Sequence, residues 1–410
     1  MNVLLLGNGF DIYYKLPTKY ANFLHVASYL SSHWPQNAQF VGEVLAQDEI
    51  HKDDPYIKAC YLAHKAIFDS TPIDTEKVEE LVSIIRKNRW FAFLHKALNK
   101  DVGWIDFEKE IAYVVSCFMS ILPADRKSFS YKSHRYGKSI VESFGFLIDQ
   151  YATNNSAVLG DQVVNTDYCI ERPFGSGNYY VNKEKVAKYL SDELHELARA
   201  LNLYLSCFVE SISQSLRKEV ICERIPIFKH IEKTVTFNYT RTYENVYLTE
   251  NTFHIHGSID KEIVLGINPD STDDVKTADT SFIAFKKYYQ RTLYETDYEY
   301  IQWASDINRT QQSYRLLVMG HSLDITDKDI LLDLFDHAKE IIILYHDVDA
   351  KSSYIANLVK LYGKTGFDAL RRNQMLTFLP LDSDFSALAQ KYTDEAFANL
   401  ITDIDPPTII

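Results

Sequence analysis

The sequence predicts an α/β protein in which a Rossmann-like, mainly parallel sheet carries a large helical insertion after its first strand. Three features predict this fold. The chain begins with a short apolar run that ends in a glycine turn, MNVLLLGNGFD. A long stretch with helical periodicity follows, and short β-branched segments recur only after Pro226. Because a first strand that is apolar on both faces needs partners, we expect the later segments to complete its sheet.

The first strand is predicted at residues 3–6, directly before Gly7, Asn8 and Gly9. A glycine turn after a buried strand lets backbone N–H groups approach an anion closely, because no Cβ stands in the way. Ile12 stands where the dinucleotide fingerprint has its third glycine, and no Lys-Ser/Thr pair follows. The turn therefore argues against an ATP-type phosphate loop, and it leaves dinucleotide binding and an ordinary tight turn both open.

Residues 21–225 are predicted to form a mostly helical insertion. Apolar residues recur at three- and four-residue spacing over residues 76–98 and 192–216, and Thr18 is a candidate N-cap for a helix that begins near Lys19. Residues 154–182 contain Gly, Asn and Ser and are predicted to be a long loop or a small excursion from the helical lobe. We therefore divide the chain into a Rossmann-like domain, residues 1–20 with 226–410, and a helical lobe, residues 21–225.

The segments after Pro226 have the length and β-branched content of strands. They are residues 233–237, 252–256, 263–266, 316–320, 341–345 and 375–379. Helical spacing over residues 328–339 supplies a crossover, which consecutive parallel strands require.

The composition is that of a globular protein of 410 residues, 46% hydrophobic and 13% aromatic. Its 43 basic residues are outnumbered by 56 acidic residues, which leaves a net charge of −13. Because nucleic-acid backbones are bound mainly by clustered Lys and Arg, this balance and the lack of a long basic run disfavour a nucleic-acid partner.

Targeting signals and disulfides are not indicated by the sequence. The 5 cysteines are scattered without a C-x-x-C pair, which favours a reducing compartment over a disulfide framework. Gly and Asp interrupt the amino-terminal apolar run too early for a signal peptide, and no stretch approaches the roughly 20 apolar residues that cross a bilayer. We therefore expect a cytoplasmic protein without a membrane partner.

Polar residues gather at the ends of several predicted strands. The clusters are GNG at residues 7–9, TFNY at 236–239, FHIHG at 253–257, and MGHSLD at 319–324 with Asp327 behind it. Because ligands of open α/β sheets bind beyond the carboxyl ends of the strands, these clusters mark the predicted site.

These clusters also have simpler explanations. Asn238 suits a turn or a helix cap, and a histidine of FHIHG suits a hydrogen-bonded position in the core. His254 and His256 alternate along a strand and so share a face, as a metal pair would, but no third ligand is evident nearby. No metal is therefore predicted.

A serine hydrolase is a further alternative. Ser322 lies in GHSLD, which differs from the nucleophile elbow G-x-S-x-G because Asp324 replaces the second glycine. The chain order Ser, Asp, His that this class requires is available with Ser322, Asp327 and His346.

Five motifs span nearly the whole chain, in the order LLLGNGFDIYYKLPTKY, WIDFEKEI, TFNYTRTYENV, HIHG and MGHSLDITDKDI. They resemble the successive motifs of the AbiH-type phage abortive-infection family. That family resembles, more distantly, the sirtuin-like NAD-binding proteins of bacterial antiphage defence. The shared features are a glycine turn after the first strand, a Thr-x-Asn motif, a strand-end His-Gly and a late Gly-x-Ser segment.

The resemblance implies a role for residues at matching positions. His256 matches the catalytic histidine, and Asn238 matches the asparagine of the Thr-x-Asn motif that begins at Thr236. Residues expected to line the NAD site are Gly7, Asn8 and Gly9 at the pyrophosphate, Gly320 and Ser322 on the adenosine-ribose side, and also Thr236 and Asp327. Asp11 falls where sirtuins carry a serine, so its inclusion in the NAD site departs from the sirtuin pattern. The sirtuin zinc cysteines are absent, which argues against protein deacylation.

The implied function is an antiphage effector that binds NAD and hydrolyses it to nicotinamide and ADP-ribose. The transition state resembles a ribosyl oxocarbenium ion, so the site has to orient the ribose and a water molecule. The Asn238 amide can hold a hydroxyl or water, and an imidazole such as His256, with an unperturbed pKa of about 6.5, can accept the proton. The alternatives are a nucleotide sensor without turnover and the serine hydrolase.

An NAD hydrolase that stays active would kill its own host, so its activity needs control. The helical insertion is the natural place for regulation or for self-association into a homo-oligomer. A phage-derived molecule or a partner protein is the expected kind of trigger.

Overall fold

The computed structural model describes residues 1–34, 38–98, 105–122, 137–146, 156–159, 162–171, 179–216, 225–259, 261–268 and 280–393. The chain forms two compact units. The first, which we call the sheet unit, consists of Met1–Leu16, Val209–Ser258 and Thr296–Ile410. The second, the helical unit, consists of Pro17–Phe208 and Ile259–Glu295.

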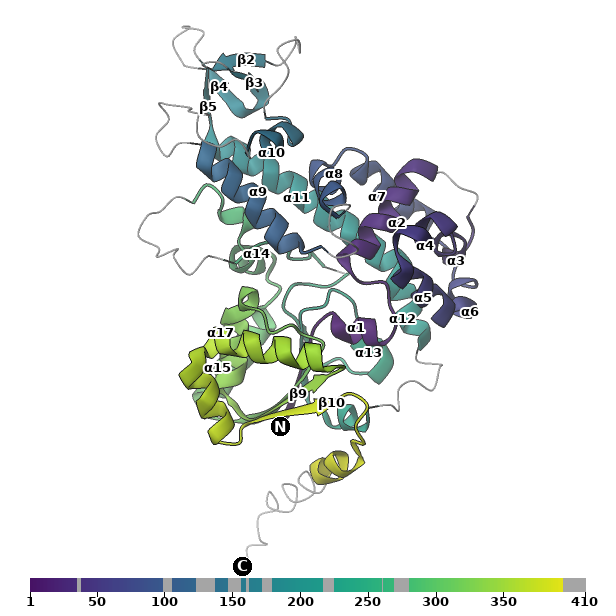
Figure 1. The fold of residues 1–410 in the computed structure, drawn as a ribbon, viewed down its shortest axis with the longest axis vertical. Helices are drawn as coiled ribbons and strands as arrows, with labels where there is room; N and C mark the ends of the chain where they lie inside the picture. Colours follow the sequence, from purple (N-terminus) through teal and green to yellow (C-terminus); the bar gives the residue numbers. More distant parts are fainter. Residues whose placement is uncertain are drawn as a thin grey trace, which may run out of the picture. The chain divides into compact units, whose positions relative to one another are not determined.

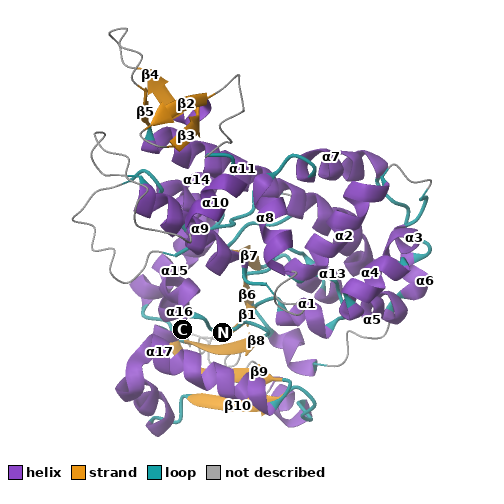
Figure 2. Ribbon diagram, turned by 45° about the horizontal axis from the view of Figure 1, so that its top comes forward, coloured by secondary structure: helices purple, strands orange, loops and turns teal. Residues whose placement is uncertain are grey.

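The sheet unit is built on a six-stranded parallel sheet (Figures 1 and 2). Its strands are β1 (Asn2–Leu6), β6 (Lys233–Thr236), β7 (Thr252–His254), β8 (Tyr314–Met319), β9 (Ala338–Tyr345) and β10 (Leu376–Pro380). The spatial order is β10-β9-β8-β1-β6-β7, and every neighbouring pair is parallel. When the strands are numbered along the chain, this is the order 3-2-1-4-5-6 of dinucleotide-binding folds. The predicted α/β class with a mainly parallel sheet is therefore confirmed.

The first strand lies at the centre of this sheet, as its unbroken apolar sequence requires. Residues 3–6 of β1 are each no more than 1% exposed, with β6 on one side and β8 on the other. Alternate side chains face a core shared with α15 (Tyr298–Thr310), α16 (Lys328–Asp336) and α17 (Val348–Arg372). Parallel sheets covered on both faces have strands of this composition.

Short helical segments lie near the carboxyl ends of β1 and β6. They include α1 (Gly9–Tyr13) after β1 and α13 (Thr242–Tyr247) after β6. Phe10 of α1 packs against Tyr243 of α13, with ring centroids 5.8 Å apart. The π-helical segment Ser206–Glu210 ends in the sheet unit, and α12 (Ser211–Leu216) and the 3₁₀ turn Pro226–His230 follow it.

The helical unit contains α2 (Tyr20–His33), α3 (Val41–Leu45), α4 (Asp48–Asp53), α5 (Pro55–Ala63), α6 (Lys65–Phe68), α7 (Thr75–Ile85), α8 (Arg89–Leu98), α9 (Phe107–Ile121), α10 (Gly137–Ser143), α11 (Lys183–Leu205) and α14 (Lys287–Tyr294). Asp106 caps α9 by accepting a hydrogen bond from the Lys109 N–H at 3.1 Å. Glu108 on the same helix forms an ion pair of 2.7 Å with the buried Lys287. Asp106 and Glu108 of the WIDFEKEI motif therefore have structural roles.

Several element boundaries differ from those expected. Residues 263–266 form no strand and belong to the helical unit, because the side-chain amide of Gln290 binds both the N–H and the carbonyl of Leu265. The segment expected at 252–256 is a strand only as far as His254. The part of residues 154–182 that the structure describes contains two small antiparallel strand pairs instead of a long loop. They are β2 (Ser156–Leu159) with β3 (Gln162–Asn165), and β4 (Cys169–Glu171) with β5 (Tyr179–Val181). The helical unit also takes in residues 259–295, which we had assigned to the Rossmann-like domain.

Candidate functional site

The loops after β1 and β8 meet where the strand order reverses, because these two central strands are neighbours. The Gly7 N–H donates to the Met319 carbonyl at 3.2 Å, and the Gly9 N–H donates to the Gly320 carbonyl at 2.9 Å. The Phe10 N–H is also used within the protein, because it donates to the Gly7 carbonyl at 2.9 Å. These three amides therefore bind protein carbonyls, which changes the expected role of the turn as a phosphate cradle.

The glycines of both loops are explained by this close backbone contact. A Cβ on Gly7 would lie 2.6 Å from the Cα of His321, and a Cβ on Gly9 would lie 2.6 Å from the Cα of Gly320. Gly320 itself has φ +72°, and its Cβ would lie 2.3 Å from the Phe10 nitrogen. Glycine is therefore required at these positions for one loop to pack on the other, whether or not a ligand binds there.

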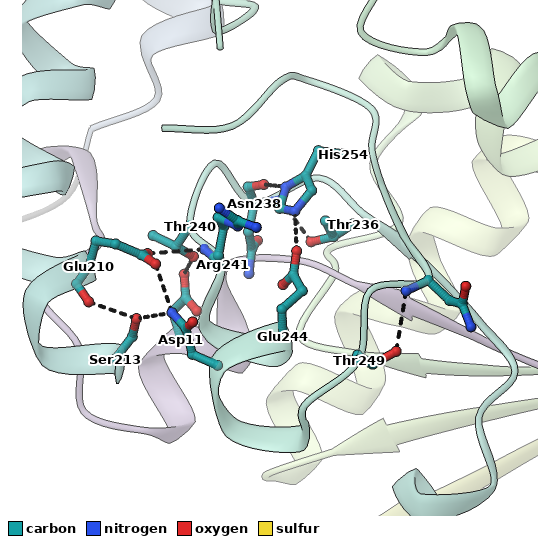
Figure 3. Close-up of polar contacts among 12 residues, drawn as sticks. Asp11, Glu210, Ser213, Thr236, Asn238, Thr240, Arg241, Glu244, Thr249 and His254 are labelled. Carbon is teal, nitrogen blue, oxygen red and sulfur yellow. Dashed lines mark hydrogen bonds and ion pairs between the residues drawn. The ribbon is translucent and has the colours of Figure 1, made fainter. Parts of the chain in front are cut away.

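Asn238, which follows β6, forms hydrogen bonds through its side chain, its backbone N–H and its backbone carbonyl. Figure 3 shows Asn238 beside Thr236 and His254. Its side-chain Nδ2 donates to the Gly7 carbonyl at 3.1 Å, and its N–H donates to the Thr236 hydroxyl at 3.1 Å. Its carbonyl accepts from His254 Nδ1 at 3.0 Å. Among the described residues, no donor binds Asn238 Oδ1. Because a carbonyl can only accept, the contact with Gly7 orients the amide and leaves Oδ1 to accept a hydrogen bond from a ligand.

His256 and His321 lie on opposite sides of one carboxylate, that of Asp327. His256 Nε2 is 3.4 Å from Asp327 Oδ1, and His321 Nε2 is 3.5 Å from Asp327 Oδ2. Their side chains are 6%, 4% and 9% exposed, so the group is largely withdrawn from water. Both imidazoles face this carboxylate, and His256 Nε2 makes no hydrogen bond to any described residue.

The tautomer of His321 follows from its second ring nitrogen. Nδ1 accepts a hydrogen bond from the Leu323 N–H at 3.0 Å, so a neutral ring carries its proton on Nε2, beside Asp327. For His256 the contact with Asp327 does not fix the tautomer, because its Nε2 lies 3.4 Å from the carboxylate without forming a hydrogen bond to it. The Phe237 ring packs against both imidazoles, with centroids 5.0 Å and 4.4 Å away, and limits their rotation.

Asp11 points into the protein, where it binds the loop between β6 and α13. Its Oδ2 accepts from the Thr240 hydroxyl at 2.6 Å, and the residue is 1% exposed (Figure 3). Burial is the main cause that raises the pKa of Asp11 to about 7, and the charges of Glu210 and Glu244 raise it further. The Thr240 and Thr242 hydroxyls act in the opposite direction. Asp11 thus joins α1 to the Asn238 loop.

The raised pKa of Asp11 predicts that stability falls as the pH rises. The native state holds a proton between the ordinary pKa of 3.8 and about 7, where the unfolded chain has released it. The stabilisation by this proton is complete below pH 3.8 and is lost as the pH rises from 3.8 to about 7. The free energy of unfolding falls by on the order of 4 kcal/mol over that interval. We expect Asp11→Asn to flatten the dependence of unfolding free energy on pH, as measured by urea denaturation at about pH 5 and about pH 8. A small slope of the same sign should remain because burial also raises the pKa of Glu210; an unchanged slope would contradict the assignment.

The family comparison agrees with these strand-end motifs. Residues 3–346 match the family model described as Bacteriophage abortive infection AbiH. The chain belongs to the AbiH family. No curated protein and no solved structure matches it. Of the helices that the structure describes, none is long and apolar enough to cross a membrane.

The serine-hydrolase constellation is not assembled in this AbiH chain. Ser322 is exposed, and its hydroxyl accepts from the Asp324 N–H at 3.4 Å. Asp327 faces His256 and His321, whereas His346 lies 3.1 Å from Asp347. A triad of Ser322, Asp327 and His346 is therefore not supported.

His254 and His256 do not form a pair, although they are two residues apart. His254 binds Glu244, whereas His256 lies beyond the end of β7 and faces Asp327. Within the described residues, no group of three metal-ligating side chains is present.

Sequence reasoning missed His321 and Glu244 as members of the AbiH site. Both stand inside quoted motifs, MGHSLDITDKDI and TFNYTRTYENV, but neither occupies a position with a sirtuin-like counterpart. For His321 the available signal was a polar side chain just after a strand, whereas Glu244 lies on α13 and had no such signal. The remaining predicted residues, Asn8 and Ser322, are exposed at the ends of β1 and β8, and Gly320 lies between Ser322 and β8.

Proposed function

We propose that this AbiH-family protein binds NAD beyond the carboxyl ends of its central strands and hydrolyses it to nicotinamide and ADP-ribose during phage infection. The observation that carries the proposal is the buried Asp327 carboxylate facing Nε2 of His256 at 3.4 Å. A base whose imidazole is oriented by a carboxylate is a recurrent arrangement in hydrolytic sites. The strand order supports a dinucleotide as substrate, because such ligands bind where this order reverses.

The proposed reaction breaks the bond between the ribose C1′ and the nicotinamide nitrogen, and the bonding electrons leave with neutral nicotinamide. A water oxygen then bonds to C1′, and the water proton passes to the His256 imidazole. The Asp327 carboxylate stabilises the imidazolium that forms. Asn238 Oδ1 accepts a hydrogen bond from a ribose hydroxyl or from the water and thereby orients it.

The glycine turn has a different part in this proposal from the one first expected. The amides of Gly7 and Gly9 donate to the last residue of β8 and to the residue after it. The turn therefore acts by fixing the carbonyl of Gly7, which orients Asn238. The NAD pyrophosphate then depends on other donors. NAD binding by Asn8, Gly320 and Ser322 remains a prediction, as do self-association through the helical unit and the nature of the trigger.

The function is tested by incubating the purified protein with NAD and measuring nicotinamide and ADP-ribose by chromatography. The same assay is run on the protein recovered from phage-infected cells, since activation depends on infection in this proposal. Equal amounts of both products, formed only after infection, would support it. Binding of NAD without release in either preparation would favour the nucleotide sensor instead.

Asp327→Asn should lower nicotinamide release roughly 10²- to 10⁴-fold. The amide can accept a hydrogen bond from only one of the two flanking imidazoles, and its NH₂ group forces the other into the wrong tautomer. Asp333→Asn is the matched control, because Asp333 accepts a hydrogen bond from Tyr300 at 2.5 Å on α16, away from the histidines. Equal activities of the two variants, at equal folded fractions, would remove Asp327 from the mechanism.

A further inference from the structure

We propose that His254 and Glu244 form a positioning pair that holds the backbone of Asn238 and thereby aims its side-chain oxygen. This inference rests on the proposed function for its kinetic test, but the contacts that carry it belong to the fold. Neither residue contacts the reacting atoms in the proposal. They act through Asn238.

The pair is short and withdrawn from water. His254 Nε2 lies 2.5 Å from Glu244 Oε1, and the two side chains are 14% and 13% exposed. The other ring nitrogen, Nδ1, lies 3.0 Å from the Asn238 carbonyl (Figure 3). The imidazole thus connects α13 to the loop after β6, from its position at the end of β7.

The hydrogen-bond partners of the His254 ring indicate which of its nitrogens carries a proton. A backbone carbonyl only accepts, so Nδ1 of His254 carries a proton. Nε2 faces a carboxylate, so the second proton is shared between His254 and Glu244 in a charge-assisted hydrogen bond. Both nitrogens are engaged, and for this reason His254 is a positioning residue whereas His256 supplies the base.

The contact with the Asn238 carbonyl completes a set of three restraints. Thr236 binds the backbone N–H of Asn238, and His254 binds its backbone carbonyl. The Gly7 carbonyl binds its side-chain Nδ2. Without the third restraint, the peptide between residues 238 and 239 can rotate, and Oδ1 moves with the backbone. A displacement of about 1 Å at a positioned group can cost about 10²-fold in rate.

The kinetic test uses Glu244→Ala, His254→Ala and the conservative Glu244→Gln. We expect the alanine variants to lower kcat for nicotinamide release about 10- to 100-fold with little change in KM, because Asn238 acts on the transition state. Glu244→Gln should restore most of the activity, because its side-chain NH₂ can donate to Nε2 while Nδ1 keeps the proton that it donates to the Asn238 carbonyl. Tyr300→Phe is the control, since it deletes a partly buried hydrogen bond of 2.5 Å, between Tyr300 and Asp333, in the same unit.

Backbone amide exchange provides a second readout that needs no turnover. In His254→Ala, the amides of residues 237–241 should exchange faster than in Tyr300→Phe at equal global stability. Unchanged exchange there, or a kcat per folded molecule no lower than in Tyr300→Phe, overturns the positioning pair. If the wild type releases no nicotinamide, the proposed function fails, and the exchange result alone decides on the pair.

Discussion

His256→Ala is expected to abolish nicotinamide release, with a loss of roughly 10²- to 10⁴-fold or more, and to remove protection of infected cells. The alanine leaves Asp327 in place but removes the atom that accepts the water proton. Asn238→Ala should cause a smaller loss, because it removes a positioned acceptor and leaves the base. Nicotinamide release and plaque counts measure the two effects.

A matched control separates chemistry from folding. His64 in the helical unit has the same exposed fraction as His256, 5%, so His64→Ala removes an equally buried imidazole. We expect it to lower the melting temperature without lowering nicotinamide release per folded molecule. Retention of full protection by both His256→Ala and Asn238→Ala would show that NAD cleavage is the wrong assignment.

Gly320→Ala is expected to give the largest loss of stability of any single methyl addition proposed for the sheet unit. Its backbone has φ +72°, and the added Cβ would lie 2.3 Å from the Phe10 nitrogen and 2.5 Å from the Gly9 carbonyl carbon. These are backbone atoms of β1's own loop, so the contact cannot be relieved by a side-chain rotation. We expect a destabilisation above about 4 kcal/mol, or a fall in melting temperature on the order of 10 °C.

Gly363→Ala is the control for backbone strain. Gly363 also has a positive φ, +66°, but nothing lies within 4 Å of its added Cβ. Its substitution should cost about 1–3 kcal/mol from conformation alone. The difference in unfolding free energy between the two variants, measured by urea denaturation, gives the contribution of the contact between the loops after β1 and β8. Equal losses would mean that the contact between the glycine loops contributes nothing.

The sequence alone determined the sheet and its approximate strands. Strands are predicted from the order of apolar and β-branched residues within a short segment. The run before Gly7 and the segments after Pro226 have that order, so no knowledge of distant residues was needed. It also determined the family, because the motifs occur in order. It did not determine that residues 263–266 would be held by the Gln290 side chain instead of a neighbouring strand, since that partner is 25 residues from Leu265.

The partners of the strand-end side chains were decided only by the tertiary structure. His254 and His256 look equivalent in the sequence, yet one binds Glu244 and the other faces Asp327 because β7 ends between them. Gly9 looks like a phosphate-binding glycine, yet its open side is filled by Gly320, more than 300 residues later. Residue type and spacing specify what a side chain can do, whereas the convergence of strands far apart in the chain specifies which atoms it meets.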